Sequence, residues 1–396
     1  MIQMIPYGRQ DINQADIDAV VNVLRSDFLT QGPVVPAFEK TVATYCCARY
    51  GVAVNSATSA LHVACLALGV GKGDIVWTTP ITFVASANCA LYCGATVDFV
   101  DIDPKTYNLS VDCLKEKLAI AEKRGKLPKV VIPVHLCGQP CDMEIIHALS
   151  QQYGFKIIED ASHAIGGRYK DEPIGNCRFS DITVFSFHPV KIITTGEGGM
   201  ALTNDELLAK GMRLLRSHGI TSDAADMQPR PPLELWNYQQ IELGFNYRMT
   251  DIQAALGLSQ MQRLDEFVAA RHALVGRYDC MLSGLPVVQP WQHPDGYSSY
   301  HLYVIRLKLD EISKTHREVY ALVRAAGVLV NLHYIPVYRQ PYYEQMGFTA
   351  GYCAEAEQYY SEALSLPLYP GLGELQQEYV VTALKNALNG QERCDS

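Results

Sequence analysis

Short apolar segments alternate with amphipathic ones over about residues 16 to 265 of the chain. The apolar segments are rich in Val and Ile and mostly lack the alternation of a half-exposed strand, so we expect a sheet with helices on both faces. The expected strands are 51–54, 75–78, 96–100, 130–134, 156–159, 182–187 and 199–203. Because Pro133 cannot donate a hydrogen bond to a neighbouring strand, its strand is expected to be bulged or near an edge.

Helical periodicity separates these strands and continues beyond them. It predicts helices at 57–68, 111–123, 143–152 and 251–268, the last of them capped by Thr250. Later segments predict a strand at 301–307, helices at 315–326, 354–364 and 376–388, and a frayed polar tail. The proline-rich stretch 218–240 predicts a surface loop. We therefore expect an α/β protein with a large domain over 1–265, including an N-terminal arm, and a smaller α+β domain over 266–396.

Composition excludes several classes of protein. The chain has 396 residues and a net charge of −9, from 33 basic and 42 acidic residues, which argues against binding nucleic acid. Apolar runs fall short of the ~18 residues that span a bilayer, so no membrane association is expected. The first residues lack the features of a signal peptide. We therefore expect a cytoplasmic protein whose 12 cysteines are reduced thiols.

The first segment with candidate chemistry is a small-residue turn between a strand and a helix, within residues 52–68. Small residues let a ligand approach the backbone, and the free amides of a helix start favour an anion. Thr58 and Ser59 add hydroxyl donors. By itself the segment also fits an ordinary capped crossover helix.

Three later segments add charged groups. Residues 155–167 place Glu159 and Asp160 at the end of an apolar strand, where open α/β sheets build ligand crevices, although an acid there can simply cap a helix. Residues 180–200 place Ser186 at a strand end and Lys191 before a glycine-rich loop. Such a lysine is either a solvated surface residue or, when desolvated, a former of Schiff bases. Residues 243–260 place Asn246 and Arg248 before a long helix, where capping is the ordinary role.

One cysteine cluster is a weak metal candidate. His135, Cys137 and Cys141 stand close together, but Cys-x3-Cys has no second pair downstream. We expect a turn at 138–140 after a buried strand and no metal.

Taken together, the segments supply what pyridoxal 5'-phosphate (PLP) requires: an acid for the pyridine nitrogen, donors for the phosphate and a lysine for the aldehyde. Their order and spacing resemble the DegT/DnrJ/EryC1/StrS family of sugar aminotransferases. The resemblance covers nearly the whole chain and rests on RSDFLTQGPVVPAFE, NSATSAL, TTPITFVASAN, EDASHAIG, FSFHPVKIITTGEGG and GFNYRMTDIQAALGLSQ. It implies the aspartate aminotransferase-like fold of type I PLP enzymes, with a large mixed sheet, and transaminase activity.

The resemblance also implies residue roles. Lys191 would form the Schiff base and carry protons, and Asp160 would pair with the pyridine nitrogen. Phe83 would stack on the ring, and His163 would lie near the ring hydroxyl. The phosphate would be held by Ala57, Thr58, Ser186 and, from the neighbouring subunit of a homodimer, Asn246. Histidine replaces the lysine in a related branch of sugar-deoxygenating enzymes, so Lys191 favours transamination. Cys137 stands where the wider family often has Tyr.

Within the family, DFLTQGP and NLHYIPVYRQPYY resemble most the branch of pseudaminic acid synthesis. This implies glutamate as donor and UDP-2-acetamido-2,6-dideoxy-β-L-arabino-hex-4-ulose as acceptor, aminated at C4. Tyr334 and Tyr338 would offer an apolar wall to the 6-methyl group, and Arg9 and Arg248 are candidates for the glutamate carboxylate. The residues expected to contact the nucleotide sugar are Tyr7, Asp27, Phe28, Leu29, Thr30, His333 and Tyr334.

Three alternatives remain. A C4 aminotransferase for another UDP-4-keto-sugar, such as UDP-4-keto-arabinose, would share every motif above. A non-catalytic nucleotide-sugar binder would have no use for Lys191. A nicotinamide-dependent oxidoreductase would need G-x-G-x-x-G after its first strand, and the glycines at 69–73 have another spacing and follow a helix.

Overall fold

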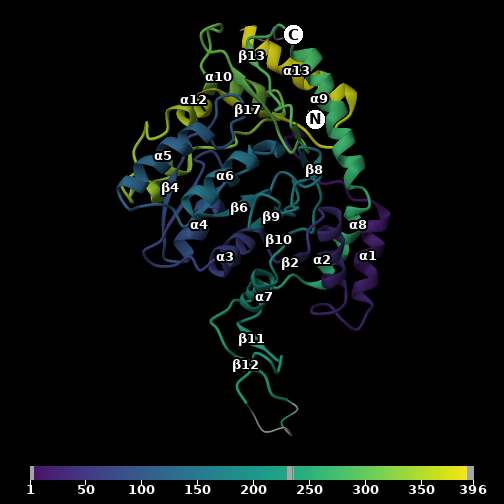
Figure 1. Cartoon of the computed structure of the whole chain (residues 1–396). Coiled ribbons are helices and arrows are strands. Elements are labelled where there is room, and N and C mark those ends of the chain that lie inside the picture. Colours follow the sequence, from purple (N-terminus) through teal and green to yellow (C-terminus); the bar gives the residue numbers. More distant parts are fainter. Residues whose placement is uncertain (1–3, 230–233, 235, 390–396) are drawn as a thin grey trace.

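A seven-stranded mixed sheet forms the centre of the computed structural model, which describes residues 4–229, 234 and 236–389 (Figure 1). Strands β10 and β9 pair antiparallel, as do β10 and β2, and the remaining neighbours are parallel. In spatial order the strands are β2 (Tyr50–Val54), β10 (Gly199–Thr203), β9 (Ile182–Ser186), β6 (Lys156–Asp160), β5 (Val130–Ile132), β3 (Ile75–Thr78) and β4 (Thr96–Phe99).

Helices cover both faces of this sheet, as its apolar strands predict. On one face α3 (Ala57–Ala67), α4 (Ala85–Tyr92) and α7 (Glu206–Leu215) share a buried core with Val54, Val76 and Val184. On the other face, residues that alternate with these pack against two groups of helices. These groups are α2 (Val34–Tyr45) with α8 (Asp251–Met261), and α5 (Val111–Lys123) with α6 (Met143–Tyr153).

A second core lies in the C-terminal part of the chain. The antiparallel strands β13 (Val287–Val288), β15 (Tyr303–Leu307) and β17 (Ala363–Leu366) pack with three helices. The helices are α9 (Leu264–Leu282), α10 (His316–Ala325) and α13 (Glu374–Asn389). Ile5 of β1 (Ile5–Pro6) joins this core, because β1 pairs with β16 (Val328–Leu329). The N-terminal arm thus contacts the C-terminal unit, and the boundary at residue 265 stays a prediction.

The other elements are short or peripheral. Helix α1 (Gln14–Leu24) packs on α8. Strands β7 (Arg168–Tyr169), β8 (Glu172–Pro173) and β14 (Gly296–Tyr297) form a small sheet. Short helices lie at η1 (Leu136–Gly138), η2 (Val337–Arg339) and α11 (Pro341–Glu344), followed by α12 (Ala354–Glu362). The described helices include none with both the length and the apolar character needed to cross a membrane.

The predicted helix 251–268 is wrong in its continuity. Helix α8 ends at Met261 and α9 begins at Leu264. Between them the Arg263 guanidinium forms ion pairs with Asp11 and the buried Asp16, at 2.6 Å each. The break between α8 and α9 therefore depends on a long-range contact, which local periodicity could not predict.

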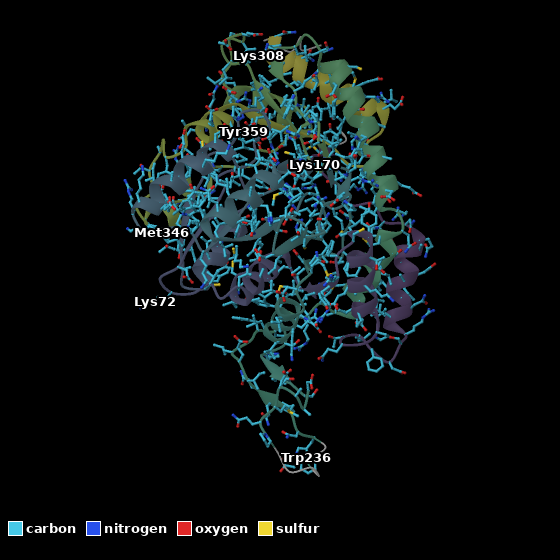
Figure 2. The ribbon with its side chains drawn as sticks, in the orientation of Figure 1. Lys72, Lys170, Trp236, Lys308, Met346 and Tyr359 are labelled. Carbon is cyan, nitrogen blue, oxygen red and sulfur yellow. The ribbon has the colours of Figure 1, made fainter. Side chains whose placement is uncertain are left out.

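Three further boundaries differ from the sequence pattern. β5 ends at Ile132, so Pro133 follows the strand, and β5 lies inside the sheet rather than at its edge. The predicted helix 354–364 ends at Glu362, because the next residues pair with β15 as β17. The predicted loop 218–240 contains the paired strands β11 (Ile220–Thr221) and β12 (Gln239–Gln240). This segment projects from the body, with exposed Trp236 near its far end (Figure 2). The predicted frayed tail lies outside the described residues.

Candidate active site

A cavity of about 690 Å³ opens at the carboxyl ends of β6 and β9, beside the start of α3. Residues from both halves of the chain line this cavity, and they include most of the site residues predicted from the sequence. The predicted residues in its wall are Tyr7, Ala57, Thr58, Phe83, Asp160, His163, Ser186, Lys191, His333 and Tyr334.

Asp160 is the last residue of β6 and is buried at the cavity. Ser86 of α4 donates a hydrogen bond of 2.6 Å to Oδ2, and the Ser162 hydroxyl donates one of 2.5 Å to Oδ1. The Ser162 backbone amide also donates to Oδ1, at 3.1 Å. These three hydrogen bonds fix the orientation of the Asp160 carboxyl group, as is required of an acid that pairs with a cationic ring.

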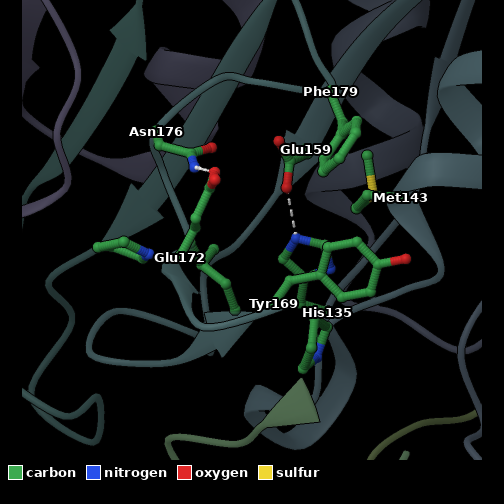
Figure 3. Close-up of a pocket in the computed structure, with 10 residues that line it drawn as sticks. His135, Met143, Glu159, Tyr169, Glu172, Asn176 and Phe179 are labelled. Carbon is green, nitrogen blue, oxygen red and sulfur yellow. Dashed lines mark hydrogen bonds and ion pairs between the residues drawn. The ribbon is translucent and has the colours of Figure 1, made fainter. Parts of the chain in front are cut away.

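Glu159 points to the opposite side of β6, as strand alternation demands. Figure 3 shows its carboxylate facing the ring of His135, whose Nε2 lies 2.7 Å from Oε2. Ser180 and Thr183 donate hydrogen bonds to Oε1. Burial by itself would raise the pKa of Glu159, but the contact with His135 and these two hydrogen bonds outweigh it and hold the pKa below its ordinary value. The carboxylate is therefore satisfied within the fold and does not face the cavity.

The predicted turn lies earlier than expected, because the chain turns at Leu136–Gly138 and is already extended at Gln139. The backbone amide of Cys141 donates to Nδ1 of His135, so Nε2 carries the proton that faces Glu159. Cys137 adopts a left-handed conformation in η1 with φ 60°, and its amide donates to Nδ1 of His163 at 3.3 Å. The described residues contain no group of three His, Cys, Asp or Glu side chains able to hold a metal ion.

Lys191 lies in the loop between β9 and β10, in the wall of the cavity. Burial lowers the pKa of its amine to about 8, although the Asp160 carboxylate acts in the opposite direction. At pH 7 roughly a tenth of such an amine is neutral, far more than for an ordinary lysine. A neutral amine is the form that attacks an aldehyde.

The start of α3 supplies an anion site at the same cavity. Ser56 caps the helix by accepting a hydrogen bond from the Ser59 amide. The first-turn amides of Ala57 and Thr58 have no carbonyl partner within the helix, and they lie in the cavity wall. Gly199 of β10 makes this close packing possible, because a Cβ there would lie 2.6 Å from the amide nitrogen of Ala57.

Aromatic and imidazole rings form another part of the wall. Phe83 precedes α4, and its ring centroid lies 6.4 Å from that of Tyr334. The hydroxyl of Tyr334 lies 3.2 Å from Nε2 of His163. Because Nδ1 of His163 accepts the Cys137 amide and burial lowers the pKa of the ring well below its ordinary value, His163 is neutral and donates from Nε2.

The arm reaches the same wall. Tyr7 follows β1, and its ring lies 5.0 Å from that of His333. His333 is fixed by Ser365, whose hydroxyl lies 2.8 Å from Nδ1, and burial lowers its pKa to about 3. His333 is therefore a neutral hydrogen-bonding group at physiological pH.

Some predicted residues do not line the cavity. Tyr338 is fully buried and donates a hydrogen bond of 2.9 Å to Glu357, so its expected place in a wall beside the sugar methyl is wrong. Arg9 and Arg248 are likewise outside the lining. The segment 27–30 and Asn246 are not among the residues that line the cavity of their own chain. Thr30 is bridged to Thr250, and Asn246 to Ser217.

Sequence reasoning missed several functional positions. Ser86 and Ser162 stand in the quoted segments TTPITFVASAN and EDASHAIG, but hydroxyls in such segments are common, and only the fold shows that both contact Asp160. His301 was not singled out either; it does not line the cavity, but its ring centroid lies 4.4 Å from that of His163. Further lining residues that were not singled out are Ser56, Thr82, His188, Glu197 and Asn331.

The chemical groups in the wall of this cavity are those that PLP requires. The cavity wall contains free helix amides and hydroxyls suited to a phosphate, together with a buried carboxylate and a desolvated lysine. The comparison with known proteins agrees with this fit. Residues 10–385 match the DegT/DnrJ/EryC1/StrS aminotransferase family.

The chain belongs to this family. It is therefore a sugar aminotransferase with the fold of the family's PLP-dependent enzymes. The spore coat polysaccharide biosynthesis protein SpsC of Bacillus subtilis is 38% identical over 98% of both chains. The UDP-4-amino-4,6-dideoxy-N-acetyl-β-L-altrosamine transaminase of Campylobacter jejuni is 35% identical over 97% of this chain and 98% of its own. GDP-perosamine synthase of Caulobacter vibrioides is 38% identical over 90% of this chain and 91% of its own.

Solved structures resemble the whole chain. Helicobacter pylori PseC, an aminotransferase involved in the biosynthesis of pseudoaminic acid, has a TM-score of 0.89 at 28% identity, over 98% of this chain and 100% of its own. The PLP form of the putative sugar aminotransferase Spr1654 from Streptococcus pneumoniae has a TM-score of 0.87 at 30% identity, over 98% of this chain and 99% of its own. The expected mixed-sheet fold and the expected enzyme class are confirmed.

Proposed function

We propose that this enzyme binds PLP through Lys191 and transfers an amino group from L-glutamate to C4 of UDP-2-acetamido-2,6-dideoxy-β-L-arabino-hex-4-ulose. The product would be UDP-4-amino-4,6-dideoxy-N-acetyl-β-L-altrosamine. The observation that carries the proposal is a lysine with a lowered pKa in the same cavity wall as a buried aspartate that accepts three hydrogen bonds.

When bound, the cofactor supplies an electron sink for the carbon that loses or gains a proton. The chain holds and moves the protons. Asp160, oriented by Ser86 and Ser162, would keep the pyridine nitrogen protonated. The Lys191 amine, partly neutral near pH 7, would take a proton from the donor's carbon and return one to the acceptor's.

The remaining lining residues would bind and orient. The amides of Ala57 and Thr58, with the hydroxyls of Thr58 and Ser186, would hold the phosphate. Phe83 has 59% of its surface exposed although it lines the cavity, so its face is available to stack on a ring. His163 would lie near the ring hydroxyl.

Two features support a nucleotide sugar as the acceptor. Tyr7, His333 and Tyr334 extend the cavity wall beyond the lysine, with room and neutral donors for a sugar. The altrosamine transaminase and PseC are similar over nearly the whole chain, and the segment NLHYIPVYRQPYY, which supplies His333 and Tyr334 to this wall, carries part of the resemblance to their branch.

A shared active site in a homodimer is part of the proposal. Asn246 and residues 27–30 do not line the cavity of their own chain, and Phe28 and Leu29 are exposed. The partner's copy of Asn246 would reach the phosphate, and the partner's segment 27–30 would reach the nucleotide.

GDP-perosamine synthase, at 38% identity, makes a GDP-linked 4-keto-sugar the second candidate acceptor. Another UDP-linked sugar, UDP-4-keto-arabinose, is the third. A pentose lacks the 6-methyl group, and one missing contact of this size costs ~1–3 kcal/mol, so related sugars should react slowly rather than not at all.

Cofactor attachment is tested by reducing the enzyme with borohydride and digesting it. The peptide that contains Lys191 should carry the cofactor mass, and Lys191→Ala should lose the covalent adduct while Lys129→Ala keeps it. An adduct on another lysine of the unmodified enzyme would refute the assignment.

The acceptor is tested by comparing specificity constants with glutamate as donor. The panel contains the L-arabino keto-sugar, its D-xylo epimer at C5, UDP-4-keto-arabinose and a GDP-linked 4-keto-6-deoxyhexose. We expect the L-arabino compound to have the highest value. A tenfold or greater preference for another member would replace the proposed acceptor with that sugar and leave the cofactor assignment intact.

A further inference from the structure

The pair formed by Glu159 and His135 lies on the side of β6 that faces away from the active-site cavity, and both residues are buried. The space beside them has a volume of about 10 Å³, room for about one water molecule. The proposed reaction makes no use of this pair. Glu159 is nevertheless the strand neighbour of Asp160, so a contact that fixes Glu159 also acts on the backbone of Asp160.

The chain segment that follows β5 holds one edge of the Asp160 backbone. The Asp160 amide donates a hydrogen bond of 2.9 Å to the carbonyl of Pro133, and the His135 amide donates one of 3.1 Å to the carbonyl of Asp160. On the other edge of β6, the Ala161 amide donates one of 2.9 Å to the carbonyl of Val184 in β9. The backbone at Asp160 is therefore hydrogen-bonded to both neighbouring segments of the sheet.

The side chains of the pair join the same segments a second time. Nδ1 of His135 accepts the Cys141 amide, and Nε2 donates a hydrogen bond of 2.7 Å to Oε2 of Glu159. The segment after β5 is thus tied to β6 both through the backbone of Asp160 and through the side chain of its neighbour. The Thr183 hydroxyl donates to Oε1 of Glu159 at 3.1 Å, so the carboxylate also ties β6 to β9.

Stability alone does not account for polar groups at this place. Met143, Tyr169 and Phe179 lie around the pair, as Figure 3 shows, and a buried carboxylate is costly in such surroundings. Well-packed apolar residues of similar volume are often as stable as a buried charged pair, or more so. A fully hydrogen-bonded network instead adds a unique arrangement, because its partners are all satisfied in one geometry only.

We propose that Glu159 and His135 are positioning residues for Asp160, fixing its backbone so that its carboxyl group meets the pyridine nitrogen of the cofactor. The proposal rests on the role proposed for Asp160. Ser86 and Ser162 set the orientation of the Asp160 carboxyl group, whereas the pair on the far side of β6 sets the place of the backbone that carries it.

The test variant is Glu159→Gln, which keeps the shape of the side chain. A carboxylate accepts hydrogen bonds at both oxygens, but a glutamine amide has one acceptor oxygen and one donor nitrogen. It cannot accept from His135 on one side and from Thr183 on the other. One donor then faces another donor, and the local backbone should shift.

The readout compares two cofactors in titrations of the cofactor-free protein, followed by absorbance. One is PLP, and the other is its 1-deaza analogue, in which carbon replaces the pyridine nitrogen and leaves Asp160 without a ring partner. We expect the wild type to bind PLP at least about tenfold more tightly than the analogue, because a hydrogen bond to a charged group is lost. Glu159→Gln should lose most of this preference, while its affinity for the analogue stays within about threefold of the wild-type value.

Three variants serve as controls. Ile157→Ala removes a buried side chain from the same face of β6 and should lower stability to urea without changing the preference for PLP. Asp160→Asn should abolish the preference, and adding Glu159→Gln to it should have no further effect. Thr183→Val removes one donor to the carboxylate and should reduce the preference about threefold, which keeps the proposal testable if Glu159→Gln does not fold.

The outcomes separate the positioning pair from the role of Asp160. If the wild type discriminates and Glu159→Gln discriminates equally well, or binds both cofactors more weakly by the same factor, the positioning role is overturned and the role of Asp160 stands. If the wild type and Asp160→Asn both bind the two cofactors alike, the role proposed for Asp160 fails, and the positioning role fails with it.

Discussion

Replacing Lys191 by Met should stabilise the cofactor-free protein near pH 7, because the fold holds this amine where burial disfavours its charge. Burial lowers the pKa of Lys191 from 10.5 to about 8, a difference of about 2.5 units. At 1.36 kcal/mol per unit, protonating the buried amine costs up to ~3 kcal/mol of folding free energy. The side chain is partly accessible in the cavity wall, so water there makes this figure an upper bound.

The sign follows from the two pKa values. Below about pH 8 the amine is protonated in both states, and the folded state bears the full cost. Between about pH 8 and 10.5 the unfolded state binds more protons, so the wild type gains stability as the pH rises. Above 10.5 the amine is neutral in both states, and this contribution disappears. The advantage of Lys191→Met should therefore be largest at pH 7 and vanish by about pH 10.5.

Urea unfolding of the cofactor-free proteins, followed by tryptophan fluorescence at several pH values and one protein concentration, measures this difference. The matched control is Lys72→Met at an exposed position (Figure 2), for which no pH-dependent difference is expected. Equal stability of wild type and Lys191→Met at pH 7, or an advantage that grows above pH 8, would refute the claim that Lys191 is desolvated.

Three further predictions concern the cofactor site. Mixing inactive Lys191→Ala and Asn246→Ala subunits should restore activity, because one site per mixed dimer is intact; no recovery after verified subunit exchange would argue against a shared site. Ser86→Ala should weaken cofactor binding by about 1.5–3 kcal/mol in a PLP titration followed by absorbance, since the Asp160 carboxylate loses its 2.6 Å donor; unchanged affinity would contradict this. Gly199→Ala should cost about 1–3 kcal/mol in thermal or urea unfolding, because its Cβ would lie 2.6 Å from the backbone at the start of α3; unchanged stability would show that this contact is not tight.

The sequence by itself determined the local chemistry of the site. Asp160 and Ser186 each stand at the end of an apolar strand, and the carboxyl ends of parallel strands meet at one edge of a sheet. The small residues before α3 and the lysine before the glycine loop could also be recognised in the sequence, because each motif consists of residues that are neighbours along the chain. The seven strands of the large sheet and helices α3, α5 and α6 were predicted from apolar runs and periodicity, whereas α1, α2, α4 and α7 were not.

Only the tertiary structure decided which distant segments meet. The arm residue Tyr7 and His333 stand more than 300 positions apart in the sequence, and the pairing of β1 with β16 brings them to one wall. The break before α9 comes from Arg263 reaching Asp16, and Tyr338 is buried because its ring packs in the core beside Phe99. Ser86 likewise became a functional residue only through its contact with Asp160. Periodicity reports which face of an element is buried, but the partner of that face depends on chain topology, which local sequence does not contain.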